Sequence, residues 1–341
     1  MKQFHRVLVA GLLGLLVGCA VQPAAKPEPE VLVWPAVPEP ARIKWVRSFS
    51  RPEDLGISGS FLKRLAALLF GASEDRLVRP MAVAVMGKDI YVADPGAKGV
   101  HRFDTASGDY RLLQVADGSL LPSPVGLARC GKDLLISDSS RGQLFAISAG
   151  DGAVRAVTVD TKLLQPTGLA CDDSTGRVFI SDTAAHQVKV FRRAAGGLFL
   201  DSVLGQRGAG PGEFNFPTYL WWGNDARLYV SDALNFRIQM FDGDGRVVGQ
   251  FGRLGDGSGD AARQKGVATD SLGHVYVVDS LFHAFQIFDA KGDFLLGVGN
   301  RGGDPGEFWL PTGIFIDQDL IYVADSYNSR IQVFQHMGTT P

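Results

Sequence analysis

The feature that most constrains this sequence is a motif that recurs six times, in which a short apolar run ends in aspartate and an aromatic or aliphatic residue follows nine positions later. The six aspartates are Asp94, Asp138, Asp182, Asp232, Asp279 and Asp325, and their partners are Phe103, Ile147, Phe191, Phe241, Phe288 and Phe334. Successive aspartates are 44, 44, 50, 47 and 46 residues apart. A period of this length is typical of repeat arrays and propellers, so the repeat predicts the fold class.

Each repeat contains the signals for four antiparallel strands. In five repeats the first strand begins at a proline, and in the remaining repeat Gln264 takes that position. The second strand ends in the aspartate and the third in its aromatic or aliphatic partner, while Gly245 and Gly292 close tight turns that lead to a fourth strand. Four such strands make one propeller blade, so the prediction is an all-β, six-bladed β-propeller.

The last repeat lacks a fourth strand, because only seven residues follow Phe334. Residues 41–49 have an alternating strand pattern and no repeat of their own. We expect this segment to complete the sixth blade and close the ring, which removes an exposed sheet edge. The ring then has an aspartate face, which carries the turns between second and third strands, and an opposite face, which carries the turns between first and second strands. The chain before residue 41 is expected to leave from the opposite face.

Residues 1–18 have the pattern of a bacterial lipoprotein signal peptide. Lys2 and Arg6 precede an apolar stretch that is too short to span a bilayer, and residues 16–19 resemble a lipobox ending in Cys19. This pattern predicts lipidation of Cys19 and a place in the cell envelope, on the outer membrane facing the periplasm in a Gram-negative host. Residues 19–40 would form a Pro/Ala-rich tether to a propeller at 41–341. An ordinary signal peptide with an incidental cysteine is the alternative.

The charge balance argues against a nucleic-acid partner. Removing residues 1–18 takes away two of 34 basic residues and none of 36 acidic ones, so the net charge becomes 32 − 36 = −4. Nucleic-acid binding requires a clustered basic surface, which this composition does not indicate.

Two repeats carry a fuller pattern that resembles the NHL family. Residues 210–218 with 228–241, and 304–312 with 321–334, share a Pro-Gly-Glu-Phe loop and an Asn-x-Arg-Ile-Gln run. In the fifth repeat Phe282 and Ala284 replace the asparagine and arginine, and the first three repeats keep little beyond the aspartate. The resemblance covers residues 41–335. It implies a six-bladed propeller that commonly serves as a binding platform.

Cys130 and Cys171 lie at the ends of the first strands of two neighbouring repeats. Relative to Gly126 and Gly168 their frames differ by one residue, which predicts that they point to opposite strand faces. A disulfide between them is therefore possible but disfavoured, and two buried free thiols are the alternative.

The six aspartates could suggest a ring of metal ligands, but an aspartate at a strand end more simply accepts backbone N–H groups of the following turn. We therefore interpret them as structural turn aspartates. Asn235 and Asn328 tolerate left-handed backbone, and Arg237 and Arg330 are expected to pair with carboxylates of neighbouring blades.

A catalytic zinc site is the competing hypothesis, because propeller lyases that resemble this fold hold zinc with three histidines. After residue 18 the chain offers His101, His186, His274, His283 and His336. Only His186 and His283 share a repeat position, so three converging imidazoles are hard to assemble. The sequence therefore predicts no metal, no other cofactor and no catalytic residue. A hydrolase or lyase with a metal in the central channel remains the alternative.

Two departures from the repeat are more informative. The first strands have alanine or glycine at their third position, whereas the fourth repeat has Tyr219 there, followed by Trp221 and Trp222. The phenol of Tyr219 is expected to project toward the mouth of the channel or to fill that mouth. Plain packing against its neighbours is the alternative. The pattern of residues 60–70 predicts an amphipathic helix inserted before the first blade. Its apolar stripe could pack on the propeller, or it could contact another protein or a membrane surface.

The prediction that combines these observations is a lipid-anchored, exported propeller without catalysis that binds a protein or a small ligand on its aspartate face. The candidate contacts are side chains expected to be exposed at that mouth, namely Arg207, Tyr219, Asn235, Arg237, His283, Arg301, Tyr327 and Arg330. The choice of this face rests on analogy between propellers.

Overall fold

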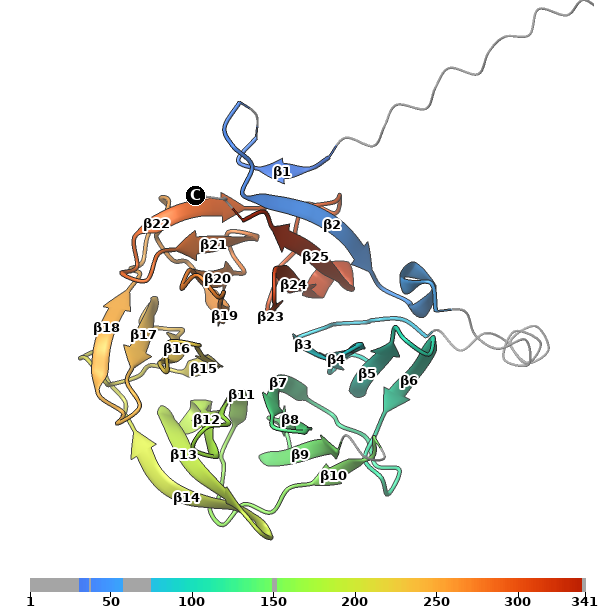
Figure 1. Cartoon of the computed structure of the whole chain (residues 1–341). Coiled ribbons are helices and arrows are strands. Elements are labelled where there is room, and N and C mark those ends of the chain that lie inside the picture. Colours follow the sequence, from blue (N-terminus) through green and yellow to red (C-terminus); the bar gives the residue numbers. More distant parts are fainter. Residues whose placement is uncertain (1–30, 37, 58–74, 149–151, 339–341) are drawn as a thin grey trace, which may run out of the picture. The chain divides into compact units, whose positions relative to one another are not determined.

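The six repeats fold into six antiparallel sheets arranged around one axis, as predicted (Figure 1). The computed structural model describes residues 31–36, 38–57, 75–148 and 152–338. The propeller lies within one compact unit, Leu32–Pro341. The predicted signal peptide with Cys19, most of the predicted tether and the predicted helix at 60–70 lie outside the described residues.

In blades one to five the four strands follow chain order from the axis outward, and in blade six the N-terminal segment supplies the fourth strand. The strands are β3 (Ala82–Met86), β4 (Asp89–Asp94), β5 (Gly99–Asp104) and β6 (Asp109–Leu113) in blade one; β7 (Pro124–Cys130), β8 (Asp133–Asp138), β9 (Gln143–Ser148) and β10 (Val154–Ala156) in blade two; β11 (Pro166–Asp172), β12 (Arg177–Asp182), β13 (Gln187–Ala194) and β14 (Gly197–Leu204) in blade three; β15 (Pro217–Trp222), β16 (Leu228–Asp232), β17 (Arg237–Phe241) and β18 (Val247–Phe251) in blade four; β19 (Gln264–Thr269), β20 (Val275–Asp279), β21 (Ala284–Phe288) and β22 (Phe294–Val298) in blade five; and β23 (Ile314–Asp317), β24 (Leu320–Asp325), β25 (Arg330–His336) and β2 (Ile43–Phe49) in blade six.

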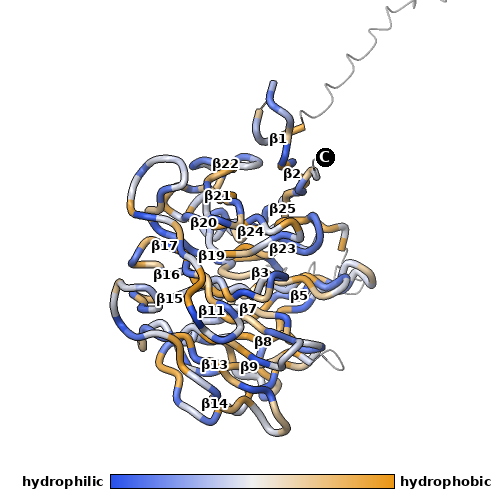
Figure 2. The backbone as a smooth tube through the Cα atoms, turned by 60° about the vertical axis from the view of Figure 1, so that its left-hand side comes forward, coloured by the Kyte–Doolittle hydropathy of each residue, from blue (hydrophilic) through white to orange (hydrophobic). Residues whose placement is uncertain are grey.

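The apolar runs form second strands because neighbouring blades cover both faces of a sheet. Every residue of β16 and β20 is buried, whereas two of the five residues of the outer strand β18 and three of the five of β22 are exposed. Hydrophobic and hydrophilic stretches therefore alternate along the chain (Figure 2). Helical structure in the described residues consists of three short 3₁₀ turns, η1 (Pro52–Leu55), η2 (Thr183–Ala185) and η3 (Ser326–Asn328), and no described helix has the length and hydrophobicity needed to span a bilayer.

The N-terminal segment closes the ring, as predicted. Strand β2 pairs antiparallel with β25, so that Ile43 lies opposite His336 and Phe49 opposite Ile331. The indole N–H of Trp45 donates to Oε1 of Gln332 at 3.1 Å. Residues from both ends of the described chain therefore share one sheet, and the sixth blade gains the fourth strand that its own repeat lacks.

The region before β2 differs from the predicted tether. Val33 and Trp34 form a fifth strand, β1 (Val33–Trp34), on the outer edge of the closing sheet, and the Trp34 ring packs 5.7 Å from that of Phe334. Val33 and Trp34, which the sequence analysis assigned to the tether, therefore belong to the closing sheet. Strand β1 runs antiparallel along the outer edge of β2, with Val33 opposite Lys44 (Figure 1).

The two cysteines form a disulfide, which the sequence analysis disfavoured. Cys130 ends β7 of blade two, Cys171 lies in β11 of blade three, and their Cα atoms are 5.4 Å apart. The reason for the error is geometric. Neighbouring blades pack face to face, so side chains that point to opposite faces of their own sheets meet between the blades. The one-residue difference in frame therefore favours the bond.

The small residues of the first strands are required by close approach of neighbouring backbones at the axis. A Cβ atom added at Gly126 would overlap the carbonyl oxygen of Thr167, and one added at Gly168 would overlap that of Thr218. These contacts involve backbone atoms, which cannot move away without shifting a strand.

We predict that Gly168→Ala destabilises the protein by about 1–3 kcal/mol, the usual cost of overpacking. The matched control is Gly297→Ala in β22, where the nearest atom to an added Cβ is Cζ of Phe294 at 3.8 Å. Urea denaturation should show a lower midpoint for Gly168→Ala than for wild type, and the midpoint of the control should equal that of wild type. Equal midpoints for the two variants would contradict the close packing at the axis.

Candidate functional site

The six repeat aspartates are fully buried and bind backbone N–H groups. Asp94, for example, accepts hydrogen bonds from the N–H groups of Val78, Arg79 and Ala97 at 2.7, 2.9 and 3.0 Å. All six carboxylates accept an N–H from the segment that leads into the first strand of their own blade. Each aspartate therefore links the segment that enters its blade to the end of the second strand, and its carboxylate oxygens accept these structural hydrogen bonds.

The arginines of the NHL-like repeats reinforce this arrangement within their own blade. Arg237 Nε donates to Asp232 at 2.9 Å, and its Nη2 donates to the carbonyls of Gly210 and Glu213. Arg330 binds Asp325 at 2.7 Å and three loop carbonyls in the same way. The expectation that these arginines pair with carboxylates of neighbouring blades is therefore wrong.

The candidate contacts on the aspartate face separate into two groups. Asn235, Arg237 and Arg330 hold the turns and loops of their blades, and the Nδ2 of Asn235 donates to Asp232 and to the Gly208 carbonyl. Arg207, Arg301 and Tyr327 are exposed on this side. Tyr327 accepts a hydrogen bond from Arg79, whose guanidinium lies 5.0 Å from the Tyr327 ring centroid. The exposed group stays a prediction for partner binding.

His283, another candidate contact, is half-buried and has a structural partner. Its Nδ1 accepts the backbone N–H of Leu310 at 3.1 Å. Burial lowers the pKa of His283, and the positive charge of Arg301 lowers it further. The imidazole is therefore held in the neutral form that this hydrogen bond requires.

Tyr219 fills the channel, one of the two placements expected for it. Its hydroxyl donates to the Met81 carbonyl at 3.2 Å. Met81 belongs to blade one and Tyr219 to blade four, which stand across the ring from each other (Figure 1). The phenol therefore crosses the axis at the level of the small first-strand residues.

Beyond Tyr219 the channel widens into a cavity of about 450 Å³ that extends to the opposite face. Tyr219 and the glycines of the first strands form its inner end, and the turns after β11 and β15 form its mouth. This volume is in the range of small-molecule sites. The sequence analysis did not name this cavity, because it placed the ligand at the other end of the channel.

One wall of the cavity is aromatic. Trp221 packs edge-to-face on Phe315 with centroids 5.5 Å apart, and its indole N–H donates to Thr269. Trp222 is stacked on Phe179 at 5.2 Å and lies under the guanidinium of Arg177. Trp221 and Trp222, which follow Tyr219 in the sequence, were the sequence signal for this aromatic wall.

The mouth of the cavity is polar and charged. Arg129, which pairs with Asp317 at 3.0 Å, is exposed there, as are Asp173 and Asn224. Asp172 is buried beside them. Burial acts to raise the pKa of Asp172, but hydrogen bonds from Ser174, Thr175 and Arg177 outweigh it and lower the pKa to about 2. Its charge is therefore fixed and is directed at these neighbours, which leaves Arg129 and Asp173 as the charged groups open to a ligand.

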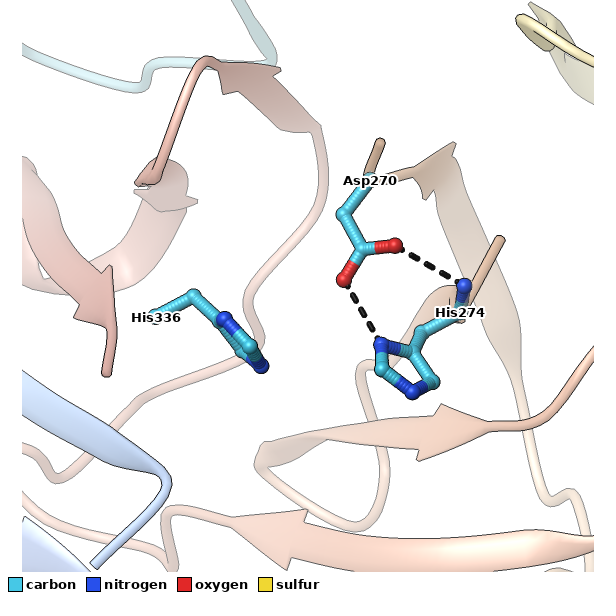
Figure 3. Close-up of side chains that lie close together, drawn as sticks. All are labelled: Asp270, His274 and His336. Carbon is cyan, nitrogen blue, oxygen red and sulfur yellow. Dashed lines mark hydrogen bonds and ion pairs between the residues drawn. The ribbon is translucent and has the colours of Figure 1, made fainter. Parts of the chain in front are cut away.

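The described histidines do not gather at the channel, since none of them is among the cavity-lining residues. Buried His101 contacts Tyr110 and Asp94, and His186 accepts the N–H of Phe216. His274 and His336 do come together, but between blades five and six, beside Asp270 (Figure 3). The three-histidine arrangement of the zinc-lyase hypothesis is therefore not formed by the described residues.

Family models match two parts of the chain. A model described as NHL repeat matches residues 163–191, and one described as a 6-bladed beta-propeller matches 266–339. The first match falls in the third repeat, where the sequence analysis found little beyond the aspartate. The repeat pattern therefore extends further along the chain than residues 210–334.

Similar proteins share parts of the sequence or the fold. The human E3 ubiquitin-protein ligase NHLRC1 is 28% identical over 139 residues, which are 41% of this chain and 32% of that protein. This chain therefore matches only a small part of its curated relatives, 32% of the length of NHLRC1 and 7% of that of the RING finger protein nhl-1 from Caenorhabditis elegans. Among solved structures, an auxiliary nutrient binding protein from Bacteroides thetaiotaomicron has a TM-score of 0.61 at 12% identity, over 78% of this chain and 71% of that one. A virginiamycin B lyase from Staphylococcus aureus has a TM-score of 0.55 at 12% identity, over 76% and 96%.

We predict that Arg237→Ala destabilises the protein by about 3–5 kcal/mol, because it leaves the buried Asp232 carboxylate without its charged partner. The control is Arg246→Ala, which removes an ion pair whose side chains are 74% and 72% exposed. Such surface pairs contribute little. Guanidinium denaturation should show a large loss for the first variant and a stability close to wild type for the second. Similar small losses in both would contradict the structural role of Arg237.

Proposed function

Since the chain belongs to the NHL-repeat family of six-bladed β-propellers, we propose that it is a lipid-anchored, extracytoplasmic binding module that holds a small ligand in the cavity on the opposite face. The observation that carries the proposal is the cavity of about 450 Å³ between Tyr219 and the turns after β11 and β15. It combines an aromatic wall with a few polar groups at its mouth, which is the usual composition of a ligand site.

The side chains of the cavity favour one chemical class of ligand. The half-buried rings of Trp221 and Trp222 offer flat apolar surfaces, while Arg129, Asp173 and Asn224 offer donors and acceptors at the rim. A saccharide or a short peptide presents both an apolar face and many hydrogen-bonding groups. Charges of both signs at the mouth favour a neutral or zwitterionic ligand over a strongly charged one.

The proposed location has two supports. Residues 16–19 have the order of apolar and small residues that precedes a lipidated cysteine. The Cys130–Cys171 disulfide joins blades two and three, and disulfides persist in oxidising compartments such as the periplasm. A nutrient binding protein among the structural neighbours is in keeping with a binding role, although that likeness concerns the fold alone.

The ligand site is tested with panels of neutral saccharides and short peptides, screened by thermal shift and titrated by tryptophan fluorescence. A panel member should bind wild type, and Asn224→Trp, which places a large ring at the exposed mouth, should weaken its affinity at least tenfold, about 1.4 kcal/mol. Trp222→Ala should weaken it similarly. Trp309→Ala on the aspartate face is the control, because Trp309 is 45% exposed and does not line the cavity. Binding lost in Trp309→Ala and kept in Asn224→Trp would overturn the assignment.

The anchor is tested by expressing the full chain in a Gram-negative bacterium with labelled palmitate. Wild type should carry the label and sediment with membranes, because acyl chains on Cys19 insert into the bilayer. Cys19→Ala should lose the label, while a variant with both Cys130→Ala and Cys171→Ala should keep it. Label on Cys19→Ala would contradict the lipid anchor.

A further inference from the structure

A second group of side chains with ligand chemistry lies away from the channel, between blades five and six. Asp270 and His274 belong to the turn that joins β19 to β20, and His336 ends β25 in the closing sheet. Figure 3 shows the two imidazoles and the carboxylate directed toward a common space. Blade five and the C-terminal strand of blade six thus each contribute to one cluster.

The donor atoms of the cluster are close enough for one ion. One donor atom from each of the three residues lies within 4.8 Å of the other two. The rings of His274 and His336 have centroids 5.8 Å apart and an interplanar angle of 40°. In a tetrahedral zinc site with bonds of about 2.1 Å, donor atoms are roughly 3.4 Å apart. The donor atoms must therefore approach one another by at most about 1.4 Å (4.8 − 3.4). Both histidines are only half-buried, so rotation about their side-chain bonds is open to them.

Asp270 is held in place by its surroundings. One carboxylate oxygen accepts the N–H groups of Leu272 and His274, both at 2.9 Å. The other accepts the Tyr276 hydroxyl at 3.1 Å and Nδ1 of His274 at 2.8 Å. Such outer contacts orient a metal ligand and fix its position before the ion arrives.

We propose that Asp270, His274 and His336 bind a divalent zinc ion, which joins blade five to the closing sheet. Two imidazoles and one carboxylate are the donor set that zinc accepts, whereas calcium and magnesium take oxygen ligands. On binding, the proton on Nδ1 of the neutral His274 is exchanged through solvent for one on Nε2, so that Nδ1 presents its lone pair to the ion and the imidazole stays neutral.

The neighbouring space can complete the coordination. A cavity of about 360 Å³ adjoins the cluster and is lined by Asp270, His336, Tyr276, Gln318 and Asp319 among others. It leaves room for a water or a ligand oxygen in the fourth position. None of its lining residues lines the channel cavity, so this inference does not depend on the proposed ligand site.

The expected effect of zinc is stabilisation of the ring beside its closure. An ion that binds the folded state alone raises the melting temperature with increasing concentration. Because the ligands come from β25 and from blade five, that gain should appear as resistance of the closing sheet to opening, measured by slower amide exchange in β25 and β2.

The test uses the purified full-length protein, treated with a chelator and titrated with zinc chloride by calorimetry. We expect one zinc per chain and a rise in melting temperature, and His336→Gln and His274→Gln should each weaken binding at least tenfold. Cobalt should give visible absorption bands of a low-symmetry nitrogen and oxygen site, and the variants should lose them. His186→Asn is the control, because asparagine tolerates the left-handed backbone found at His186 (φ 55°).

Asp270 is left unchanged in these variants, since its carboxylate also holds the turn. Zinc affinity and cobalt spectrum equal to wild type in the double variant His274→Gln/His336→Gln would overturn the proposal. So would the absence of stoichiometric zinc binding in wild type, or loss of binding in His186→Asn alone.

Discussion

The fold depends on one interaction that recurs in every blade, the buried carboxylate at the end of the second strand. Each of the six aspartates binds N–H groups of the segment that enters its own blade. In a ring of separate sheets, this contact fixes where each first strand begins relative to the rest of its blade. A charged group with no exposed surface is tolerated here because backbone donors, and in some blades Arg237, Arg330 or Lys189, satisfy it.

The same fact explains why a recognisable repeat indicates little about function. Asn235, Arg237 and Gln239 are among the most characteristic residues of the pattern, and all three hold the loop at 208–213. Gln286 does the same in blade five, where the asparagine and arginine are absent. The most characteristic residues of the repeat therefore stabilise the fold, and their polar groups are already used in hydrogen bonds to the loop.

The sequence was sufficient to predict the ring of six blades and its closure, because the repeat period and the incomplete last repeat show which strands pair with their neighbours. It was insufficient wherever two blades meet. The disulfide was misjudged because strand frames were compared within one sheet, and not across the contact between sheets. The cavity, Arg129 and Phe315 were missed because they come together from different blades, and β1 was missed because two residues are too few to show a period.

Both candidate sites lie where the blades depart from the repeat pattern. In a symmetric ring every first strand would carry a small third residue and leave an open pore, but Tyr219 crosses it and turns one end into a cavity. Asp270, His274 and His336 occupy turns and strand ends that the repeat aspartates do not use. The interactions that recur in every blade do not involve these positions, which can therefore differ from one blade to the next. A search for function in such a propeller should therefore begin with the residues in which its blades differ.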